Sequence, residues 1–280
     1  MQITDSHIHI QPFHLMPPAI AETFWKGKHN REELEAYTTD PGRLLARMDA
    51  DGVDRVGLIN YVSPDLMGFG PESNDWMARY ASADPSRLLA FGSVNPRFSK
   101  DPAGDTARVI ERGARALKVH PPHMLFRANA YQDSLPGLAD VYRVAQDARV
   151  PVTIHTGTSI FPGARSRLGD PMDVDDVAID FPRLTILLAH GGRPLWMDAA
   201  FFLVRRHPNV YLELSGVPPA KLLDYFPRLQ EIAAKTIWGT DWPSPGVASM
   251  RTNADAFLAL PLPDAAKAAI LDGNARRVWA

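Results

Sequence analysis

The sequence predicts an α/β protein that folds as one (β/α)8 barrel domain over residues 1–280. Eight short apolar segments alternate with roughly eight helical segments along the 280 residues. This alternation is typical of βαβ units and a parallel sheet, and eight units at this length favour a closed barrel. No Gly-x-Gly-x-x-Gly turn follows the first apolar segment, which disfavours an open, doubly wound sheet.

The elements follow one another in a regular order after an irregular start. A first strand is expected at 2–10. Residues 11–39 are rich in proline, aromatic and charged residues without a clear period, so we expect a long loop with at most one helical turn. The later apolar runs predict strands at 53–62, 88–95, 114–120, 150–155, 184–190, 210–215 and 236–241. Helices are expected between and after them at 41–51, 73–83, 103–112, 135–148, 174–181, 195–206, 220–234 and 263–279.

Composition excludes several classes of function. The 30 Lys and Arg nearly balance the 32 Asp and Glu, with no basic stripe, which argues against nucleic-acid binding. No apolar run approaches the ~18 residues that span a membrane. The absence of cysteine excludes a disulfide scaffold, a thiol nucleophile and a thiolate metal site. The N-terminus lacks the basic and apolar regions of a secretory signal, so we expect a cytoplasmic protein.

Histidine and aspartate residues gather where the predicted strands end. Asp5, His7 and His9 alternate on the first strand and therefore share one face. Later strands end on further polar residues, namely Lys118 and His120, His155, His190, and Asp241. A parallel barrel brings these ends to one face, where barrel active sites lie. Imidazole and carboxylate are suitable ligands for a divalent transition metal, and zinc is our first expectation.

Seven short motifs give the chain a family resemblance over nearly its whole length after the first loop. They are Asp5-Ser6-His7-Ile8-His9, Leu117-Lys118-Val119-His120-Pro121-Pro122, Ile154-His155-Thr156-Gly157, Leu188-Ala189-His190-Gly191-Gly192, Leu214-Ser215-Gly216, Trp238-Gly239-Thr240-Asp241-Trp242-Pro243 and Gly273-Asn274-Ala275. The sequence resembles the amidohydrolase superfamily, in particular the branch with aminocarboxymuconate-semialdehyde decarboxylase and resorcylate-type decarboxylases. The resemblance implies a distorted TIM barrel, one divalent metal ion and a homodimer.

The resemblance also implies roles for the strand-end residues. His7, His9, His155 and Asp241 are expected metal ligands, with Zn²⁺ as the expected ion and Mn²⁺ as an alternative. Asp241 would also exchange a proton with bound water or substrate, although such an aspartate can instead cap the following turn. His190 would act as a general acid or base or stabilise an oxyanion. A further metal ligand is its alternative role.

Three residues are candidate substrate contacts. Lys118 lies where related binuclear enzymes carry a carboxylated lysine, but this branch keeps that lysine unmodified, so a contact or structural role is expected. His120 faces the same way, with packing against a loop as its alternative. Arg165 could clamp a substrate carboxylate, unless it is an ordinary solvated arginine. Residues 11–39 are expected to form a lid over the metal, a disordered or interface loop being the alternative.

Metal-dependent hydrolysis is the activity that these residues favour. The metal would lower the pKa of bound water toward ~7, and the hydroxide would attack an amide, lactone or ester carbonyl of a small organic substrate. The alternative is metal-dependent, non-oxidative decarboxylation of a small aromatic or unsaturated carboxylate, with Asp241 or His190 protonating carbon. Both reactions need the same ligands. A barrel that only binds a ligand or stores metal is a third possibility, disfavoured because no strand-end ligand is missing.

Overall fold

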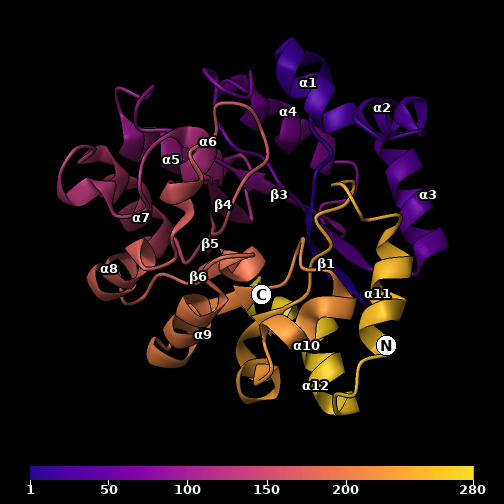
Figure 1. Cartoon of the computed structure of the whole chain (residues 1–280). Helices are drawn as coiled ribbons and strands as arrows, with labels where there is room; N and C mark the ends of the chain where they lie inside the picture. The colour runs from indigo at the N-terminus through magenta and orange to yellow at the C-terminus, as the bar shows by residue number, and fades with distance from the viewer. Residues whose placement is uncertain (280) are drawn as a thin grey trace.

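The computed structural model describes residues 1–279, which form a nearly closed barrel of eight parallel strands with helices around it (Figure 1). The strands are hydrogen-bonded in chain order, each parallel to the next. They are β1 (Thr4–Ile8), β2 (Arg55–Leu58), β3 (Leu88–Gly92), β4 (Ala116–Val119), β5 (Val152–His155), β6 (Ile186–Ala189), β7 (Val210–Glu213) and β8 (Thr236–Ile237). The predicted (β/α)8 barrel is confirmed.

Backbone hydrogen bonds between the first and last strand segments close the barrel. The amide of Ser6 donates to the Trp238 carbonyl at 3.1 Å, and the amide of His9 donates to the Trp242 carbonyl at 2.7 Å. Between them, the Asp241 amide donates to the carbonyl of His7 at 2.8 Å. The seam of the barrel therefore places Asp241 directly beside β1.

The α-helices between and after the strands match most of the predicted helical segments. They are α1 (Pro18–Trp25), α2 (Arg31–Thr39), α3 (Pro41–Asp51), α4 (Glu72–Ala81), α5 (Pro102–Glu111), α6 (Pro121–Met124), α7 (Gly137–Asp147), α8 (Asp173–Asp180), α9 (Met197–Arg206), α10 (Leu222–Tyr225), α11 (Met250–Leu258), α12 (Asp264–Ala268) and α13 (Asn274–Val278). Short 3₁₀ turns are η1 (Phe13–Leu15), η2 (Ala130–Gln132), η3 (Ser166–Gly169), η4 (His190–Gly192), η5 (Pro219–Lys221) and η6 (Leu229–Lys235), and η7 (Ala269–Gly273) is a π-helical turn.

The long segment after β1 is more ordered than expected. Residues 11–39 contain η1, α1 and α2, where the sequence indicated at most one helical turn. Each of the two helices buries a single pair of apolar side chains at helical spacing: Ile20 and Phe24 on α1, and Leu34 and Tyr37 on α2. One pair in so short a helix is too weak a periodic signal to recognise in isolation.

Two other segments also differ from expectation. The helix predicted at 220–234 is broken into η5, α10 and η6, and Pro227 lies at the break, where it removes a backbone donor and clashes with the preceding turn. Helix α11 was not predicted. It begins after Ser249, whose side-chain oxygen accepts a hydrogen bond from the Thr252 amide at 3.0 Å, an N-cap interaction.

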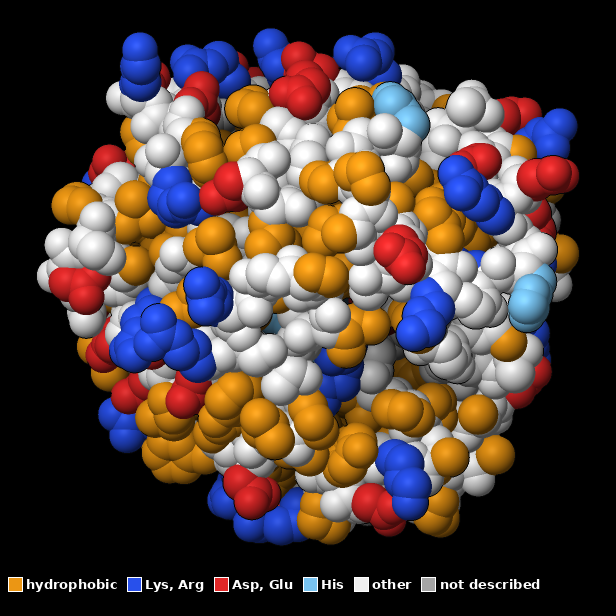
Figure 2. Space-filling view, turned by 45° about the horizontal axis from the view of Figure 1, so that its top comes forward, with side chains coloured by type: hydrophobic (Ala, Val, Ile, Leu, Met, Phe, Trp, Pro, Cys, Tyr) orange, Lys and Arg blue, Asp and Glu red, His pale blue; other side chains and the backbone are white. Residues whose placement is uncertain are grey.

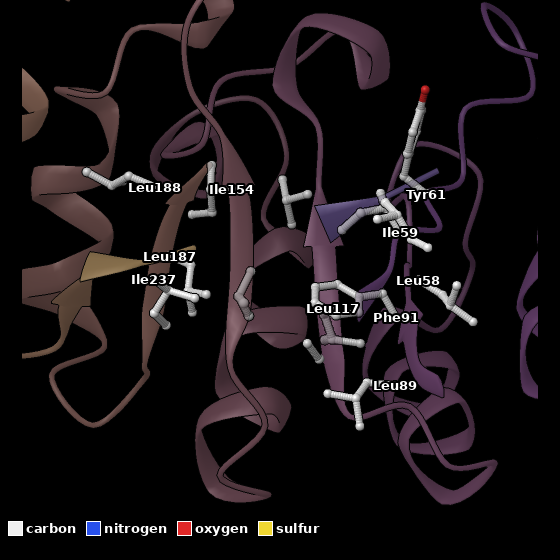
Figure 3. Packing of buried hydrophobic residues seen from close by; sticks show 14 of the residues in the cluster. Leu58, Ile59, Tyr61, Leu89, Phe91, Leu117, Ile154, Leu187, Leu188 and Ile237 are labelled. Atoms are coloured by element: carbon white, nitrogen blue, oxygen red, sulfur yellow. The ribbon is translucent and has the colours of Figure 1, made fainter. Parts of the chain in front are cut away.

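Alternation along the strands separates the apolar layer from the barrel interior. Side chains such as Leu117 and Ile154 pack with those of neighbouring strands in the hydrophobic core (Figure 3). Lys118, between Leu117 and Val119, takes the opposite side of β4 and lines a cavity. Among the described residues, no helix is both long and apolar enough to cross a membrane.

Candidate active site

A cavity of about 360 Å³ lies at the carboxyl ends of the barrel strands. Candidate site residues that line it are His9, Lys118, His120, His155, His190 and Asp241. Residues from the segment 11–39, including Phe13 and Phe24, also line it. The structure therefore brings together side chains from β4 and β5 and from the residues that follow β1, β4, β6 and β8, as the parallel topology predicts.

Three histidines and one aspartate meet at the base of this cavity, where His9, His190 and Asp241 line it and buried His7 lies behind them. We call His7, His9, His190 and Asp241 the ligand cluster. The Nε2 atoms of His7 and His9 lie 3.4 and 3.1 Å from Asp241 Oδ1. One nitrogen or oxygen atom from each of His7, His190 and Asp241 lies within 4.8 Å of the others. These three side chains are buried.

Acceptors behind the three imidazoles determine which nitrogen of each ring carries its proton. In each ring Nδ1 donates outward: His7 to Glu213 Oε2 at 2.8 Å, His9 to Gln11 Oε1 at 3.0 Å, and His190 to the Ser215 carbonyl at 2.8 Å. Carboxylate, amide and carbonyl oxygens accept these bonds. In the neutral rings Nε2 is therefore left as a lone pair, which is the form that binds a metal.

The atoms on the inner side of the ligand cluster are mainly hydrogen-bond acceptors, and such an environment suits a divalent cation. His9 Nε2 lies 3.1 Å from Asp241 Oδ1 and donates a hydrogen bond to it when that nitrogen carries a proton, and a bound cation would take the place of this proton. Buried His7 Nε2 has no hydrogen-bond partner among the described residues. Lone pairs that face one another in a buried site repel unless a cation lies between them. The donor set, imidazole nitrogens with one carboxylate, matches zinc or manganese.

The electrostatics of the site hold its groups in the charge states that metal binding requires. Burial, more than any other cause, lowers the pKa of His7 and His190 well below the ordinary value, so both rings stay neutral. Burial would raise the pKa of Asp241, but the hydrogen bond with His9 and the nearby positive charges outweigh it and keep that pKa below its usual range. Asp241 is therefore an ionised carboxylate.

The backbone at the ligand cluster is strained where two site residues leave their strands. His190 and Asp241 each have φ of 68°, a left-handed conformation that is uncommon for residues other than glycine. Buried Asp5 helps to hold this geometry, because the Thr240 amide and hydroxyl donate to its carboxylate at 2.9 and 2.6 Å. Burial is the main reason that the pKa of Asp5 rises to about 7.

His155, His120 and Lys118 form the adjacent wall. The ring of His155 lies 4.5 Å from that of His190 and stacks on His120 at 3.9 Å. Neither nitrogen of His155 has a hydrogen-bond partner within residues 1–279, so it is free to be the predicted further ligand. Lys118 Nζ is also buried without a partner there, and burial lowers its pKa to about 8.

Arg165 does not reach the cavity. Its side chain is exposed, and it does not belong to the cavity lining. Ser159 and Phe161 of the same loop line the cavity instead, and η3 begins immediately after Arg165. A loop without periodicity contains no signal for which of its side chains turn inward.

Two functional candidates were missed from the sequence. Glu213 orients His7, and burial raises the pKa of Glu213 to about 7. An acidic residue that ends an apolar strand was a signal that could have revealed it. Arg193 lines the cavity and contacts Asp241 Oδ2 with Nη2 at 3.3 Å, while Nε donates to the Gly216 carbonyl at 2.7 Å. The sequence signal for Arg193 was its position alone, two residues after Gly191.

Comparison with known proteins identifies a family and several structures of the same fold. The amidohydrolase family model matches residues 4–280. A search of the curated proteins finds no match. The 5-carboxyvanillate decarboxylase of Sphingomonas paucimobilis superimposes with a TM-score of 0.68 at 20% identity, covering 99% of this chain and 98% of that one.

Two further solved structures are similar. A probable 2-pyrone-4,6-dicarboxylic acid hydrolase of Acinetobacter baumannii has a TM-score of 0.68 at 14% identity, with 100% and 99% of the two chains covered. The 5-carboxyvanillate decarboxylase of Novosphingobium aromaticivorans, complexed with manganese and 4-hydroxy-3-methoxy-5-nitrobenzoic acid, has a TM-score of 0.63 at 15% identity, with 99% and 96% covered. At these identities the likeness establishes the shared fold.

Proposed function

This chain belongs to the amidohydrolase family of enzymes, and we propose that it is a metal-dependent hydrolase that cleaves an amide, lactone or ester bond of a small organic substrate. The observation that carries the proposal is the ligand cluster. Its Nε2 lone pairs and one ionised carboxylate point at one another at the base of the cavity, with their protons held on the outer side.

One divalent ion would be held by His7, His9 and Asp241 of the ligand cluster together with His155, while His190 would lie beside the ion as an acid or base or as a further ligand. Zinc is the proposed ion, and manganese, which a solved structure of the same fold contains, is the alternative. A bound ion of this kind polarises a carbonyl oxygen and lowers the pKa of a water molecule toward ~7. The unpartnered nitrogens of His7 and His155 support this assignment.

The protein's own groups would handle the proton. Asp241 is ionised and accepts a proton at a carboxylate oxygen, and Arg193 at 3.3 Å favours the ionised form once that proton is passed on. His190, with its Nδ1 proton held by the Ser215 carbonyl, offers Nε2 as a second acceptor. Such positioned acids and bases typically contribute 10²–10⁴-fold in rate.

The segment 11–39 would act as a lid that excludes water. Phe13 and Phe24 line the cavity and pack on each other with ring centroids 4.8 Å apart. Lys118 and His120 would contact the substrate from the β4 side. On the face in Figure 2, hydrophobic side chains are interspersed with charged side chains of both signs.

Non-oxidative decarboxylation of a small aromatic or unsaturated carboxylate is the second candidate. The aromatic lining of the cavity, including Tyr61, Phe69 and Phe161, favours it, because these rings suit a planar substrate. In that reaction Asp241 or His190 would deliver a proton to carbon as CO₂ leaves.

A direct test loads the purified chain with Zn²⁺ or Mn²⁺ and follows two products. Metal per chain is measured by elemental mass spectrometry, and about one ion is expected. Acid release is then followed with a lactone, an aryl ester and an anilide, and CO₂ release with hydroxybenzoates. Acid release that depends on metal supports the hydrolase, whereas CO₂ release alone replaces it with the decarboxylase. Neither product, or no bound metal, contradicts the proposal. The homodimer and the cytoplasmic location stay predictions.

A further inference from the structure

Three side chains on the wall of the cavity form a hydrogen-bonded chain that the proposed chemistry does not use. His123, on α6, joins Tyr61, which follows β2, to Ser159, which follows β5. His123 Nδ1 lies 3.1 Å from the Tyr61 hydroxyl, and its Nε2 lies 2.7 Å from Ser159 Oγ. All three side chains line the cavity, and Tyr61 and His123 are only 3% and 2% exposed. We call them the relay triad.

The relay triad contains one more proton than its internal hydrogen bonds consume. A neutral imidazole and two hydroxyls carry three protons, and two of these lie in the bonds to His123. Ser159 Oγ also accepts from the Phe161 amide at 3.3 Å. The Tyr61 hydroxyl has only His123 as a hydrogen-bond partner in the described part of the chain. The spare proton is on Tyr61 when Ser159 donates to His123 and on Ser159 when Tyr61 donates, so Tyr61 can offer a ligand either a donor or an acceptor.

Tyr61 can act either as a hydrogen-bond donor or as an acceptor toward a ligand, because both hydrogen bonds of His123 can change direction together. If Ser159 donates to Nε2, then Nδ1 donates to Tyr61, and the phenol proton is free for a ligand oxygen. If Tyr61 donates to Nδ1 instead, its oxygen is free to accept a ligand hydroxyl. The hydroxyl projects away from the hydrophobic side chains of the neighbouring strands (Figure 3), so it is not sealed into the core.

Planar surfaces surround this hydroxyl. The ring of His120 lies between those of His123 and His155, stacked at 3.6 and 3.9 Å. Phe69 meets the ring of Tyr61 edge-on at 6.0 Å. Tyr61 also lies edge-on to His9 with centroids 6.5 Å apart, so the relay triad is about one aromatic ring away from the ligand cluster.

We propose that the relay triad is a neutral specificity subsite, which selects substrates that carry a hydroxyl, ether or carbonyl oxygen on a planar ring. The reacting group would lie at the ligand cluster, and the ring oxygen would bond to Tyr61. The inference rests on the proposed function in that the substrate occupies the same cavity. Tyr61, His123 and Ser159 are specificity-determining here and take no part in bond cleavage.

The test compares the binding of benzoate, 3-hydroxybenzoate and 4-hydroxybenzoate by calorimetry to the full-length, zinc-loaded protein. For the wild type, at least one hydroxybenzoate is expected to bind roughly three- to tenfold more tightly than benzoate, the effect of one added hydrogen bond. Tyr61→Phe removes the hydroxyl with little change of shape and should abolish this preference while benzoate affinity stays within about twofold. Ser159→Ala should reduce the preference. The matched control is Tyr131→Phe, since the Tyr131 hydroxyl bonds to Asp180 on the outer surface.

The outcomes separate this subsite from the proposed reaction. A wild type without preference, a preference that survives in both Tyr61→Phe and Ser159→Ala, or no binding of any of the three acids overturns the subsite. Thermal unfolding of each variant checks that it is folded. A normal preference in a protein that releases neither acid nor CO₂ would leave the subsite intact and remove the proposed function. Turnover in a protein that shows no preference for hydroxybenzoates would support the proposed function and overturn the subsite.

Discussion

Two side-chain clusters that contain histidine, the ligand cluster and the relay triad, lie at the same end of the barrel and differ in where their protons are held. In the ligand cluster, His7 and His190 direct Nδ1 outward to fixed acceptors and leave Nε2 on the inner side of the cluster. In the relay triad, both nitrogens of His123 meet hydroxyl groups, which can donate or accept. The arrangement in the ligand cluster concentrates lone pairs and therefore suits a cation. The arrangement in the relay triad can donate or accept a hydrogen bond and therefore suits an uncharged oxygen of a ligand. The neighbours of a histidine, more than its place on a strand end, decide what it can bind.

Removing the negative charge of the ligand cluster should have the largest effect on metal binding and activity. Asp241→Asn keeps the shape but removes the carboxylate that faces His7 and His9. We expect zinc content to fall far below one ion per chain, and kcat/KM on any identified substrate to drop on the order of 10³-fold. Elemental mass spectrometry and steady-state kinetics measure both. Asp180→Asn, on the surface, is the control, and normal zinc content in Asp241→Asn would refute the ligand assignment.

A smaller effect is expected from the acceptor behind His7. Glu213→Gln keeps a hydrogen-bonding group near Nδ1 but removes the negative charge, and such outer partners typically change metal affinity 10–100-fold. Competition with a chromophoric chelator measures the affinity for zinc. Ser215→Ala removes the hydroxyl that donates to Glu213 at 2.8 Å and lies 3.0 Å from His190 Nδ1. It should weaken zinc binding less, because the Glu213 carboxylate and the Ser215 carbonyl still accept from His7 and His190. Equal zinc affinities in Glu213→Gln and the wild type would show that the charge of Glu213 does not hold the proton on His7 Nδ1 in a way that matters for metal binding.

The relay triad should instead affect stability as a function of pH. Burial lowers the pKa of His123 to about 3 from an ordinary 6.5, so below pH 6.5 the unfolded chain takes up a proton that the folded chain refuses. His123 therefore contributes stability above pH 6.5 that is lost as the pH falls, at roughly 1.4 kcal/mol per pH unit.

Urea unfolding of the wild type and His123→Asn at pH 7, 6 and 5 measures this contribution. The wild type should lose its advantage over the variant as the pH falls, because asparagine does not titrate. Taking the difference between the two proteins cancels the other buried histidines. A difference in the free energy of unfolding that stays constant over these three pH values would contradict a neutral His123.

Most of the fold could be predicted because parallel strands and their helices repeat a local pattern. The helix at 41–51 is found as α3, with the same bounds. The segments that could not be predicted lack such a pattern. Helices α1 and α2 each bury one apolar pair, and the break of the predicted helix near Pro227 produces 3₁₀ turns whose geometry depends on what they pack against.

The candidate site divides in the same way. His7, His9, His155 and Asp241 could be placed at one end of the barrel because strand alternation and parallel order act over short sequence distances. Glu213, 206 residues from His7, could not be assigned a role, because its function exists only in contact with that ring. For Arg165, which is exposed and outside the cavity lining, residue type and position in a loop did not determine the direction of the side chain.

The sequence by itself determined the barrel, the histidine and aspartate residues at its strand ends, and the absence of thiol chemistry. These properties follow from residue identity and from periodicity, which are local. Only the tertiary structure decided which nitrogen of each histidine in the ligand cluster faces inward, which carboxylate stays ionised, and that Tyr61 meets His123 across 62 residues. Protonation depends on burial and on neighbours from other strands, and those neighbours come together only when the barrel closes.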